Sequence, residues 1–131
     1  MAVKPPLRCL IVDDNAVFLR TVPKAVETAC VGRKRSLEIY TAVCGEDGLL
    51  LWEKVRPDLT IMDIQMPGMG GAEATRAIIK LNPNALVVGH SALEEEKELE
   101  LCIESGMKEV LPKGTSKVKE FVEKFLDEER L

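Results

Sequence analysis

Four short apolar runs in this 131-residue chain each end in a polar residue that could carry chemistry. The first run ends at Asp13-Asp14, the second at Asp63, the third at Ser91 and the fourth at Lys113. In a parallel α/β sheet, the carboxyl ends of the strands meet along one edge, and ligands bind in the crevice there. The sequence therefore predicts such a sheet, with these polar side chains gathered at one edge.

Segments with helical spacing of apolar residues alternate with strand-like runs along the whole chain. We predict five strands, at Leu7 to Val12, Leu37 to Val43, Leu59 to Met62, Ala85 to His90 and Glu109 to Leu111. We predict five helices, at Ala16 to about Cys30, Glu46 to Val55, Gly71 to Leu81, Leu93 to Ser105, and Ser116 to Leu126 or beyond. Pro23 should remove one backbone donor from the first helix and bend it. This alternation implies a parallel sheet with right-handed crossovers and helices on both faces.

The composition predicts one domain and argues against nucleic acid as a partner. With 131 residues and 46% hydrophobic side chains, the chain can form a single core, at about residues 7–127, and has no room for a second domain. Its formal net charge is −4, and its lysines are spread along the chain rather than clustered. We interpret the one local basic cluster, Arg33-Lys34-Arg35, as a solvated loop before the second strand.

The sequence predicts neither a membrane segment nor a cysteine-based site. Cys9, Cys30, Cys44 and Cys102 lie too far apart for a C-x-x-C metal or redox pattern, and no secretory segment precedes them. The longest apolar runs are much shorter than the roughly 20 residues that cross a bilayer. We therefore expect a cytoplasmic protein whose cysteines are reduced and packed as small apolar residues.

The three carboxylates at the predicted edge indicate a cation site. Acids held together without compensation repel one another, which raises their pKa values and destabilises the fold. A divalent cation and Lys113 would relieve that repulsion, and ligands that are all oxygen atoms suit Mg²⁺. A carboxylate such as Asp63 can also accept a phosphoryl group as an acyl phosphate, while the cation neutralises the charge of that group.

Four motifs together are similar to the response-regulator receiver domain of two-component signalling. They are Leu10 to Asn15, Ile61 to Met69, Ser91-Ala92 and Leu111 to Lys113, and the resemblance runs from about Leu7 to the final helix. It implies a doubly wound, flavodoxin-like sheet in the order 2-1-3-4-5. In this reading the chain is a phosphoacceptor and not an enzyme, although it assists its own phosphorylation and dephosphorylation.

The resemblance also implies a role for each matching residue. Asp63 would be the phosphoacceptor, and Asp14 and Asp63 would bind Mg²⁺ directly, with Asp13 acting largely through water. The backbone carbonyl of Gln65 would complete the protein ligands. Lys113 would pair with the phosphoryl oxygens, and the Ser91 hydroxyl would move to hydrogen-bond the phosphoryl group.

Three positions depart from the family pattern. Val110 stands where the family usually has an aromatic residue that swings inward on activation. Lys113-Gly114 replaces the usual Lys-Pro pair, which puts the family's common cis bond there in doubt. Gly70 replaces an aspartate before the third helix, at little cost because glycine also caps helices.

Some of these residues also have purely structural readings. Asp13-Asp14 alone would fit a strand-ending turn with a helix cap, and Ser91 to Glu94 fits a capping box. His90 is interpreted as a packed core residue and receives no functional role. Glu94-Glu95-Glu96 is read as a favourable first helical turn on a solvated face.

The leading hypothesis is a stand-alone receiver that accepts its phosphoryl group from a histidine kinase or histidine phosphotransfer protein. Its downstream protein partner would bind the fourth helix, fifth strand and fifth helix, the usual signalling face of the family. A receiver-like scaffold that works without phosphorylation is the alternative, which the intact acids and Lys113 disfavour. An aspartate-nucleophile phosphatase would need a second acid at Gln65, and a flavin-binding domain would not place Asp13-Asp14-Asn15 where phosphate binds.

Overall fold

The computed structural model describes residues 3–92 and 95–129, which form a five-stranded parallel sheet flanked by five helices. The strands are β1 (Leu7–Val12), β2 (Leu37–Ala42), β3 (Leu59–Asp63), β4 (Val87–Ser91) and β5 (Val110–Pro112). The helices are α1 (Ala16–Gly32), α2 (Gly45–Val55), α3 (Gly71–Leu81), α4 (Glu96–Ser105) and α5 (Ser116–Glu128). The strand order is β2-β1-β3-β4-β5, so the predicted fold class is confirmed.

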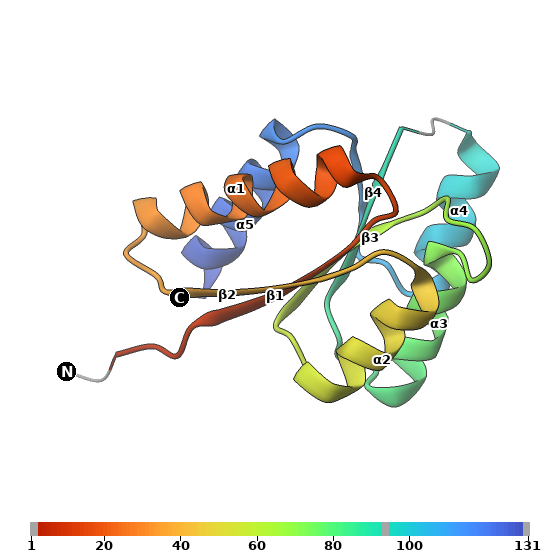
Figure 1. Cartoon of the computed structure of the whole chain (residues 1–131), viewed down its shortest axis with the longest axis horizontal. Coiled ribbons are helices and arrows are strands. Elements are labelled where there is room, and N and C mark those ends of the chain that lie inside the picture. The colour runs from red at the N-terminus through yellow and green to blue at the C-terminus, as the bar shows by residue number, and fades with distance from the viewer. Residues whose placement is uncertain (1–2, 93–94, 130–131) are drawn as a thin grey trace.

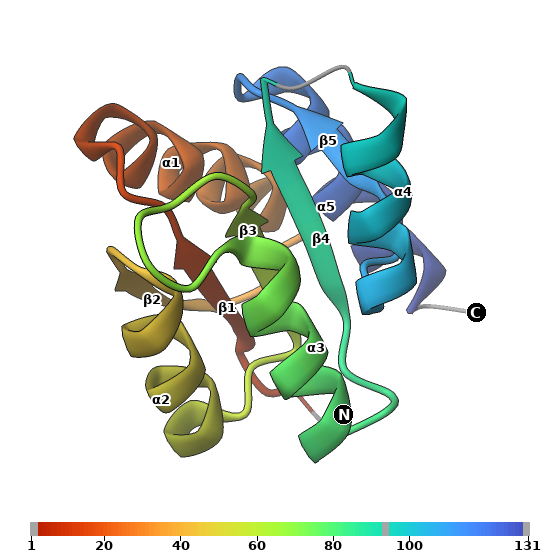
Figure 2. The same ribbon diagram turned by 90° about the vertical axis from the view of Figure 1, so that its right-hand side faces the viewer.

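Helices cover both faces of the sheet. α1 and α5 lie on one face, and α2, α3 and α4 lie on the other (Figure 1 and Figure 2). Side chains along β1 alternate between the two apolar clusters: Cys9 and Ile11 pack on the α1/α5 side, and Leu10 and Val12 pack on the opposite side. A strand buried on both faces is apolar throughout, which explains why the central strands could be recognised in the sequence.

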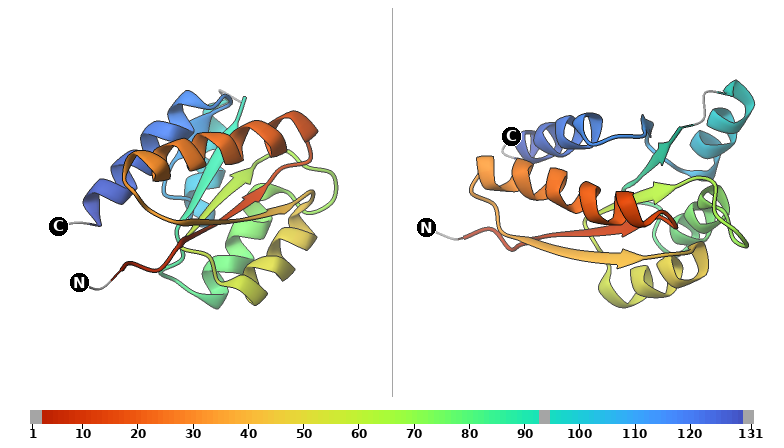
Figure 3. Two further views of the ribbon diagram at one scale, coloured as in Figure 1. Left: turned by 60° about the vertical axis from the view of Figure 1, so that its left-hand side comes forward. Right: turned by 45° about the horizontal axis from the view of Figure 1, so that its top comes forward.

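The carboxyl ends of the strands meet at one edge of the sheet. The amino end of β1 and the carboxyl end of α5 lie toward the opposite end of the molecule (Figure 3). Within the sheet, Asp63 is in register with His90 of β4, and Ser91 is in register with Pro112 of β5. The last residues of β3, β4 and β5 therefore stand side by side, with Lys113 directly after β5.

α1 begins at the predicted residue, Ala16, and α3 has the predicted glycine cap. The side chain of Asn15 accepts a hydrogen bond from the backbone N–H of Val17 at 2.8 Å and caps α1. Gly70 occupies the N-cap position of α3, as its place in the sequence indicated. Pro23 lies inside α1, which continues beyond it to Gly32.

The predicted start of the fourth helix is wrong. α4 begins at Glu96, with Glu95 at its N-cap, whereas Ser91 closes β4. Ser91 is therefore not the cap of α4, because Glu95 holds the N-cap position. Leu93 and Glu94, which the prediction placed in the first turn, lie outside the described residues.

The basic cluster after α1 is a loop before β2, as predicted, and Lys34 is exposed, but Arg33 and Arg35 form ion pairs instead of standing in solvent. The guanidinium of Arg33 donates to both carboxylate oxygens of Asp127, at 3.0 and 2.9 Å, and to Glu123 at 3.1 Å. Arg35 pairs with Glu129, and its side chain is only 11% exposed. These ion pairs attach the end of α5 to the loop before β2.

Three of the four cysteines are packed as the sequence predicted. Cys9, Cys30 and Cys102 are buried free thiols, and Trp52 of α2 is buried in the core. Among the residues that the structure describes, no helix combines the length and apolar character needed to span a membrane.

Candidate functional site

The three predicted carboxylates meet at the edge of the sheet. Asp13 and Asp14 follow β1, and Asp63 ends β3. One oxygen atom from each residue lies within 4.8 Å of the others. Asp13 and Asp63 are buried, at 2% and 6% exposed, while Asp14 is open to solvent. The cluster thus has a buried floor and one exposed side from which a ligand can enter.

Backbone hydrogen bonds fix the turn that carries Asp13. Its N–H donates to the carbonyl of Ala42 at 3.1 Å, and its Oδ1 accepts from the N–H of Asn15 at 2.9 Å. Asn15 then caps α1, so the helix does not need Asp14 as its cap. The structural reading of Asp13-Asp14 is therefore only half right, since Asp13 shapes the turn and its other oxygen faces the site.

Lys113 is the cation of the site. Its Nζ contacts Asp13 Oδ2 and lies 3.3 Å from Asp63 Oδ1. Its backbone N–H donates to the carbonyl of Ser91 at 2.9 Å, which ties the end of β5 to the end of β4. The ammonium also lies 4.2 Å from the ring centroid of Phe18 in α1, within cation–π range.

The environment of Asp63 disfavours its charged form. Burial, with smaller contributions from Asp13 and Asp14, raises the pKa of this carboxyl to about 6 against the opposing effect of Lys113. Lys113 therefore does not fully compensate the acids around it. A second cation at the cluster would favour the ionised form of Asp63.

A tight loop joins Asp63, at the end of β3, to the start of α3. The Gly71 N–H donates to the carbonyl of Ile64 at 2.9 Å, and a Cβ at Gly71 would stand 2.1 Å from the carbonyl oxygen of Asp63. Only glycine allows this approach. Glu46 Oε1 accepts from the Met69 N–H at 3.2 Å and holds the far side of the loop. Gln65 is an exposed residue of the loop, and its role as a carbonyl ligand stays a prediction.

Ser91 and Val110 occupy the neighbouring strands. Ser91 ends β4 and is 5% exposed. Val110 begins β5 and is half-buried. The structure therefore brings Asp13, Asp14, Asp63, Ser91 and Lys113 to one edge, as the strand ends predicted.

His90 has contacts that the sequence did not reveal. It is buried, and its Nε2 lies 2.9 Å from the carbonyl oxygen of Gly114. Its ring meets Phe18 edge to face, with centroids 5.4 Å apart and an interplanar angle of 88°. Burial lowers the pKa of His90, and the charge of Lys113 lowers it too. A single histidine in an apolar strand gave no sequence signal for these contacts.

The donor set fits a hard divalent cation. All three clustered side chains offer carboxylate oxygens, and they include no sulfur or imidazole ligand. Mg²⁺ prefers oxygen ligands and keeps several waters, so a site held by a few carboxylates with one open side suits it. The uncompensated burial of Asp63 is the observation that favours a cation here.

Comparison with known proteins identifies the family. Residues 9–126 match the response regulator receiver domain. Chemotaxis protein CheY of Thermotoga maritima is 34% identical over 107 residues, which cover 81% of this chain and 84% of that protein. Response regulator GacA of Pseudomonas aeruginosa is 31% identical over 109 residues, or 82% of this chain. The match spans 49% of GacA, so this chain corresponds to about half of that relative.

Solved structures agree with the fold. A CheY-like response regulator receiver domain protein from Methanospirillum hungatei superposes with a TM-score of 0.82 at 23% identity, covering 96% of this chain and 98% of that one. CheY in the CheX–CheY–BeF₃–Mg²⁺ complex of Borrelia burgdorferi gives a TM-score of 0.74 at 25% identity, covering 93% and 89%. With the family match spanning most of its length and the acidic edge in place, the chain belongs to the response regulator receiver domain family.

Proposed function

We propose that this chain is a phosphorylation-operated signalling switch in which Asp63 accepts a phosphoryl group. One observation carries the proposal: Asp63 is buried at the strand edge with Lys113 at 3.3 Å and two further carboxylates within 4.8 Å. The donor would be a phosphohistidine on a histidine kinase or phosphotransfer protein. A carboxylate oxygen of Asp63 forms the bond to phosphorus while the P–N bond breaks and the imidazole nitrogen keeps the electron pair.

The remaining site residues have distinct tasks in this proposal. Mg²⁺, when bound, neutralises charge on the transferred group. Asp14 and Asp63 hold it directly, Asp13 acts largely through water, and the Gln65 carbonyl completes the protein ligands. Lys113 pairs with the phosphoryl oxygens, and the Ser91 hydroxyl donates a hydrogen bond to the phosphoryl group.

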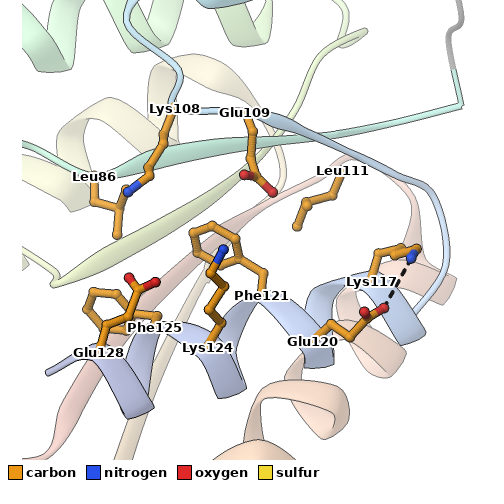
Figure 4. A pocket seen from close by; sticks show the side chains of 10 residues that line it. All are labelled: Leu86, Lys108, Glu109, Leu111, Lys117, Glu120, Phe121, Lys124, Phe125 and Glu128. Atoms are coloured by element: carbon orange, nitrogen blue, oxygen red, sulfur yellow. Dashed lines mark ion pairs between the residues drawn. The ribbon is translucent and has the colours of Figure 1, made fainter. Parts of the chain in front are cut away.

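The output of the switch is a contact with another protein through α4, β5 and α5. A cavity of about 400 Å³ lies on this side, between α5 and the segments that lead into β4 and β5 (Figure 4). Phe121 and Phe125 face it from α5, and lysine and glutamate side chains surround them, including the pair Lys117–Glu120 at 3.2 Å. An apolar centre with a charged rim is the usual composition of a protein interface.

A relative supports a protein partner of this kind. CheY of Borrelia burgdorferi was solved in complex with CheX, together with BeF₃ and Mg²⁺. By analogy we propose that this chain works in the cytoplasm as one signalling unit, with its core at about residues 7–127, and binds a downstream protein when phosphorylated.

The test is to find the phosphorylated residue. Incubation with acetyl phosphate and Mg²⁺ should produce an adduct that base and hydroxylamine remove, as expected for an acyl phosphate, and Asp63→Asn should abolish it. Asp58→Asn is the matched control, because Asp58 lies just before β3 and accepts a hydrogen bond from the Arg8 N–H. A comparable yield from Asp63→Asn would refute the assignment, and no adduct on the wild type would favour the scaffold alternative.

A further inference from the structure

His90 is a buried polar side chain that the proposed phosphoryl transfer does not use. It is 1% exposed and lies in β4 directly before Ser91. Its Nε2 is 2.9 Å from the Gly114 carbonyl oxygen. A carbonyl oxygen only accepts hydrogen bonds, so Nε2 carries the hydrogen and donates it. His90 thus contacts the backbone immediately after Lys113.

The backbone at Lys113-Gly114 depends on such contacts to stay in place. Gly114 has φ +127°, a conformation that residues with side chains rarely adopt, and nothing lies within 4 Å of the position where its Cβ would be. A glycine in open space does not restrain its own backbone. Two successive residues of β4 restrain it instead, because the Ser91 carbonyl accepts from the Lys113 N–H and the His90 ring donates to Gly114.

The His90 ring also contacts Phe18, and Phe18 in turn contacts the Lys113 ammonium. The two rings meet edge to face at 5.4 Å, which fixes the orientation of Phe18. The face of Phe18 lies 4.2 Å from Lys113 Nζ. His90 therefore acts on Lys113 at two points. Its hydrogen bond to Gly114 restrains the backbone next to Lys113, and its contact with Phe18 restrains the ring that the ammonium faces.

We propose that His90 is a positioning residue for Lys113: its hydrogen bond to Gly114 and its contact with Phe18 direct the ammonium toward Asp13 and Asp63. This inference rests on the proposed function insofar as it concerns phosphorylation. A packed core residue at position 90 would fill the same volume but would leave the Lys113-Gly114 backbone held on one side only. Small displacements of a positioned group cost rate, so His90 should affect phosphorylation without touching the phosphoryl group.

The test uses two substitutions that separate the hydrogen bond from the ring. His90→Gln keeps an N–H donor that reaches the position of Nε2 but removes the ring, whereas His90→Phe keeps an aromatic ring and removes the donor. Val88→Ala is the control for lost core packing, because Val88 is buried in the same strand, in the apolar cluster against which Phe18 packs. All proteins are compared below the melting temperature of the least stable one.

The first measurement is the initial rate of adduct formation on Asp63 with acetyl phosphate at saturating Mg²⁺. We expect His90→Phe to be about 10-fold slower or more. His90→Gln should stay within about threefold of the wild type, because it restores the hydrogen bond, and Val88→Ala should keep the wild-type rate. If His90→Phe reacts at the wild-type rate, or if His90→Gln is as slow as His90→Phe, the proposal is overturned.

The second measurement does not depend on phosphorylation. In the wild type, the Phe18 ring should shift the NMR signals of the Lys113 ε-methylene protons upfield, because the ammonium lies near the centre of the ring face. His90→Phe should move these signals toward their unshifted values, because loss of the hydrogen bond to Gly114 lets the Lys113-Gly114 backbone carry the ammonium away from the ring. His90→Leu, which lacks the donor as well, is the second variant if His90→Phe does not fold, and Phe18→Leu gives the unshifted reference because it removes the ring itself. Unchanged Lys113 signals in the folded His90 variants would overturn the proposal. If the wild type forms no adduct while the signals still move, the proposed function fails and the positioning role stands.

Discussion

Lys113 lies closer to Asp13 than to Asp63: its Nζ is 2.5 Å from Asp13 Oδ2 and 3.3 Å from Asp63 Oδ1. The shorter of the two contacts of the Lys113 ammonium thus goes to an acid that is not the proposed phosphoacceptor. The pKa of Asp63 is raised chiefly by burial, and the longer contact with Lys113 does not offset this effect. A cation bound at the cluster would compete with Lys113 for Asp13 and would allow the lysine to turn toward a phosphoryl group on Asp63.

This arrangement predicts that Lys113 stabilises the metal-free protein. Lys113→Met should lower the free energy of unfolding by about 3 kcal/mol, because it leaves Asp13 and Asp63 buried without their cation. Mg²⁺ should restore more stability to this variant than it adds to the wild type. Urea denaturation in EDTA and in Mg²⁺ measures both effects, with Lys119→Met, at an exposed position of α5, as the control. Equal stability of Lys113→Met and the wild type in EDTA would show that the ion pairs contribute nothing.

The raised pKa of Asp63 predicts a pH-dependent difference between two proteins. Its pKa is about 6 in the folded state against an ordinary value of 3.8, so folding strengthens proton binding. The contribution of Asp63 to the free energy of unfolding is fully present below its unfolded pKa and is lost as the pH rises through about 6. At neutral pH the free energy of unfolding is therefore lower, by on the order of 2–3 kcal/mol, than it would be with Asp63 protonated. Metal-free Asp63→Asn should therefore be more stable than the wild type at pH 7 and lose that advantage toward pH 4.

Urea denaturation in EDTA across this pH range checks the difference. His90, whose pKa is lowered by burial, favours the folded state above its unfolded pKa and so has the opposite slope in wild type and variant alike. Subtracting the two curves removes its contribution. A difference that does not change with pH would contradict the raised pKa of Asp63.

Asp14 should matter for the metal and little for the metal-free fold. Its side chain is exposed, unlike those of Asp13 and Asp63. Asp14→Asn should leave the melting temperature in EDTA at or slightly above that of the wild type, because it removes one acid from a repelling cluster. It should also remove most of the thermal stabilisation by Mg²⁺, since the folded protein would bind the ion less tightly. Glu104→Gln, an exposed acid of α4, is the control, and undiminished Mg²⁺ stabilisation in Asp14→Asn would count against the metal site.

The conformational change on phosphorylation should be transmitted from the site through the backbone after β4 to α4. Val110 cannot swing an aromatic ring inward, so the change must follow the backbone after Ser91. With BeF₃⁻ as the phosphoryl mimic, amide exchange in α4 should change in the wild type, and Ser91→Ala should suppress that change. The variant should still form the adduct on Asp63. Ser36→Ala, at the opposite end of the sheet, controls for the loss of a hydroxyl. If amide exchange in α4 is the same with and without BeF₃⁻, the conformational change must reach another surface of the protein.

The sequence by itself determined the sheet and the composition of its edge. Helical segments separate the apolar runs that end in Asp63 and Lys113. Each helix returns the chain to the same end of the sheet, so these runs form parallel strands whose carboxyl ends lie together. The start of α1 at Ala16 and the glycine cap of α3 at Gly70 were equally readable, since a helix start depends on its immediate neighbours. Local signals of this kind need no knowledge of the rest of the fold.

The tertiary structure decided which distant residues meet. Arg33 pairs with Asp127, and His90 donates to Gly114, across separations of 94 and 24 residues. No periodic pattern encodes these contacts, because they depend on how α5 packs beside α1 and on where β5 ends. The start of α4 was missed for the same reason, since Glu95 caps this helix although the residues from Ser91 onward fit a helix cap. The sequence specified what stands at the edge of the sheet, and only the packing of its elements established that Lys113 lies between Asp13 and Asp63 and that His90 holds the backbone behind it.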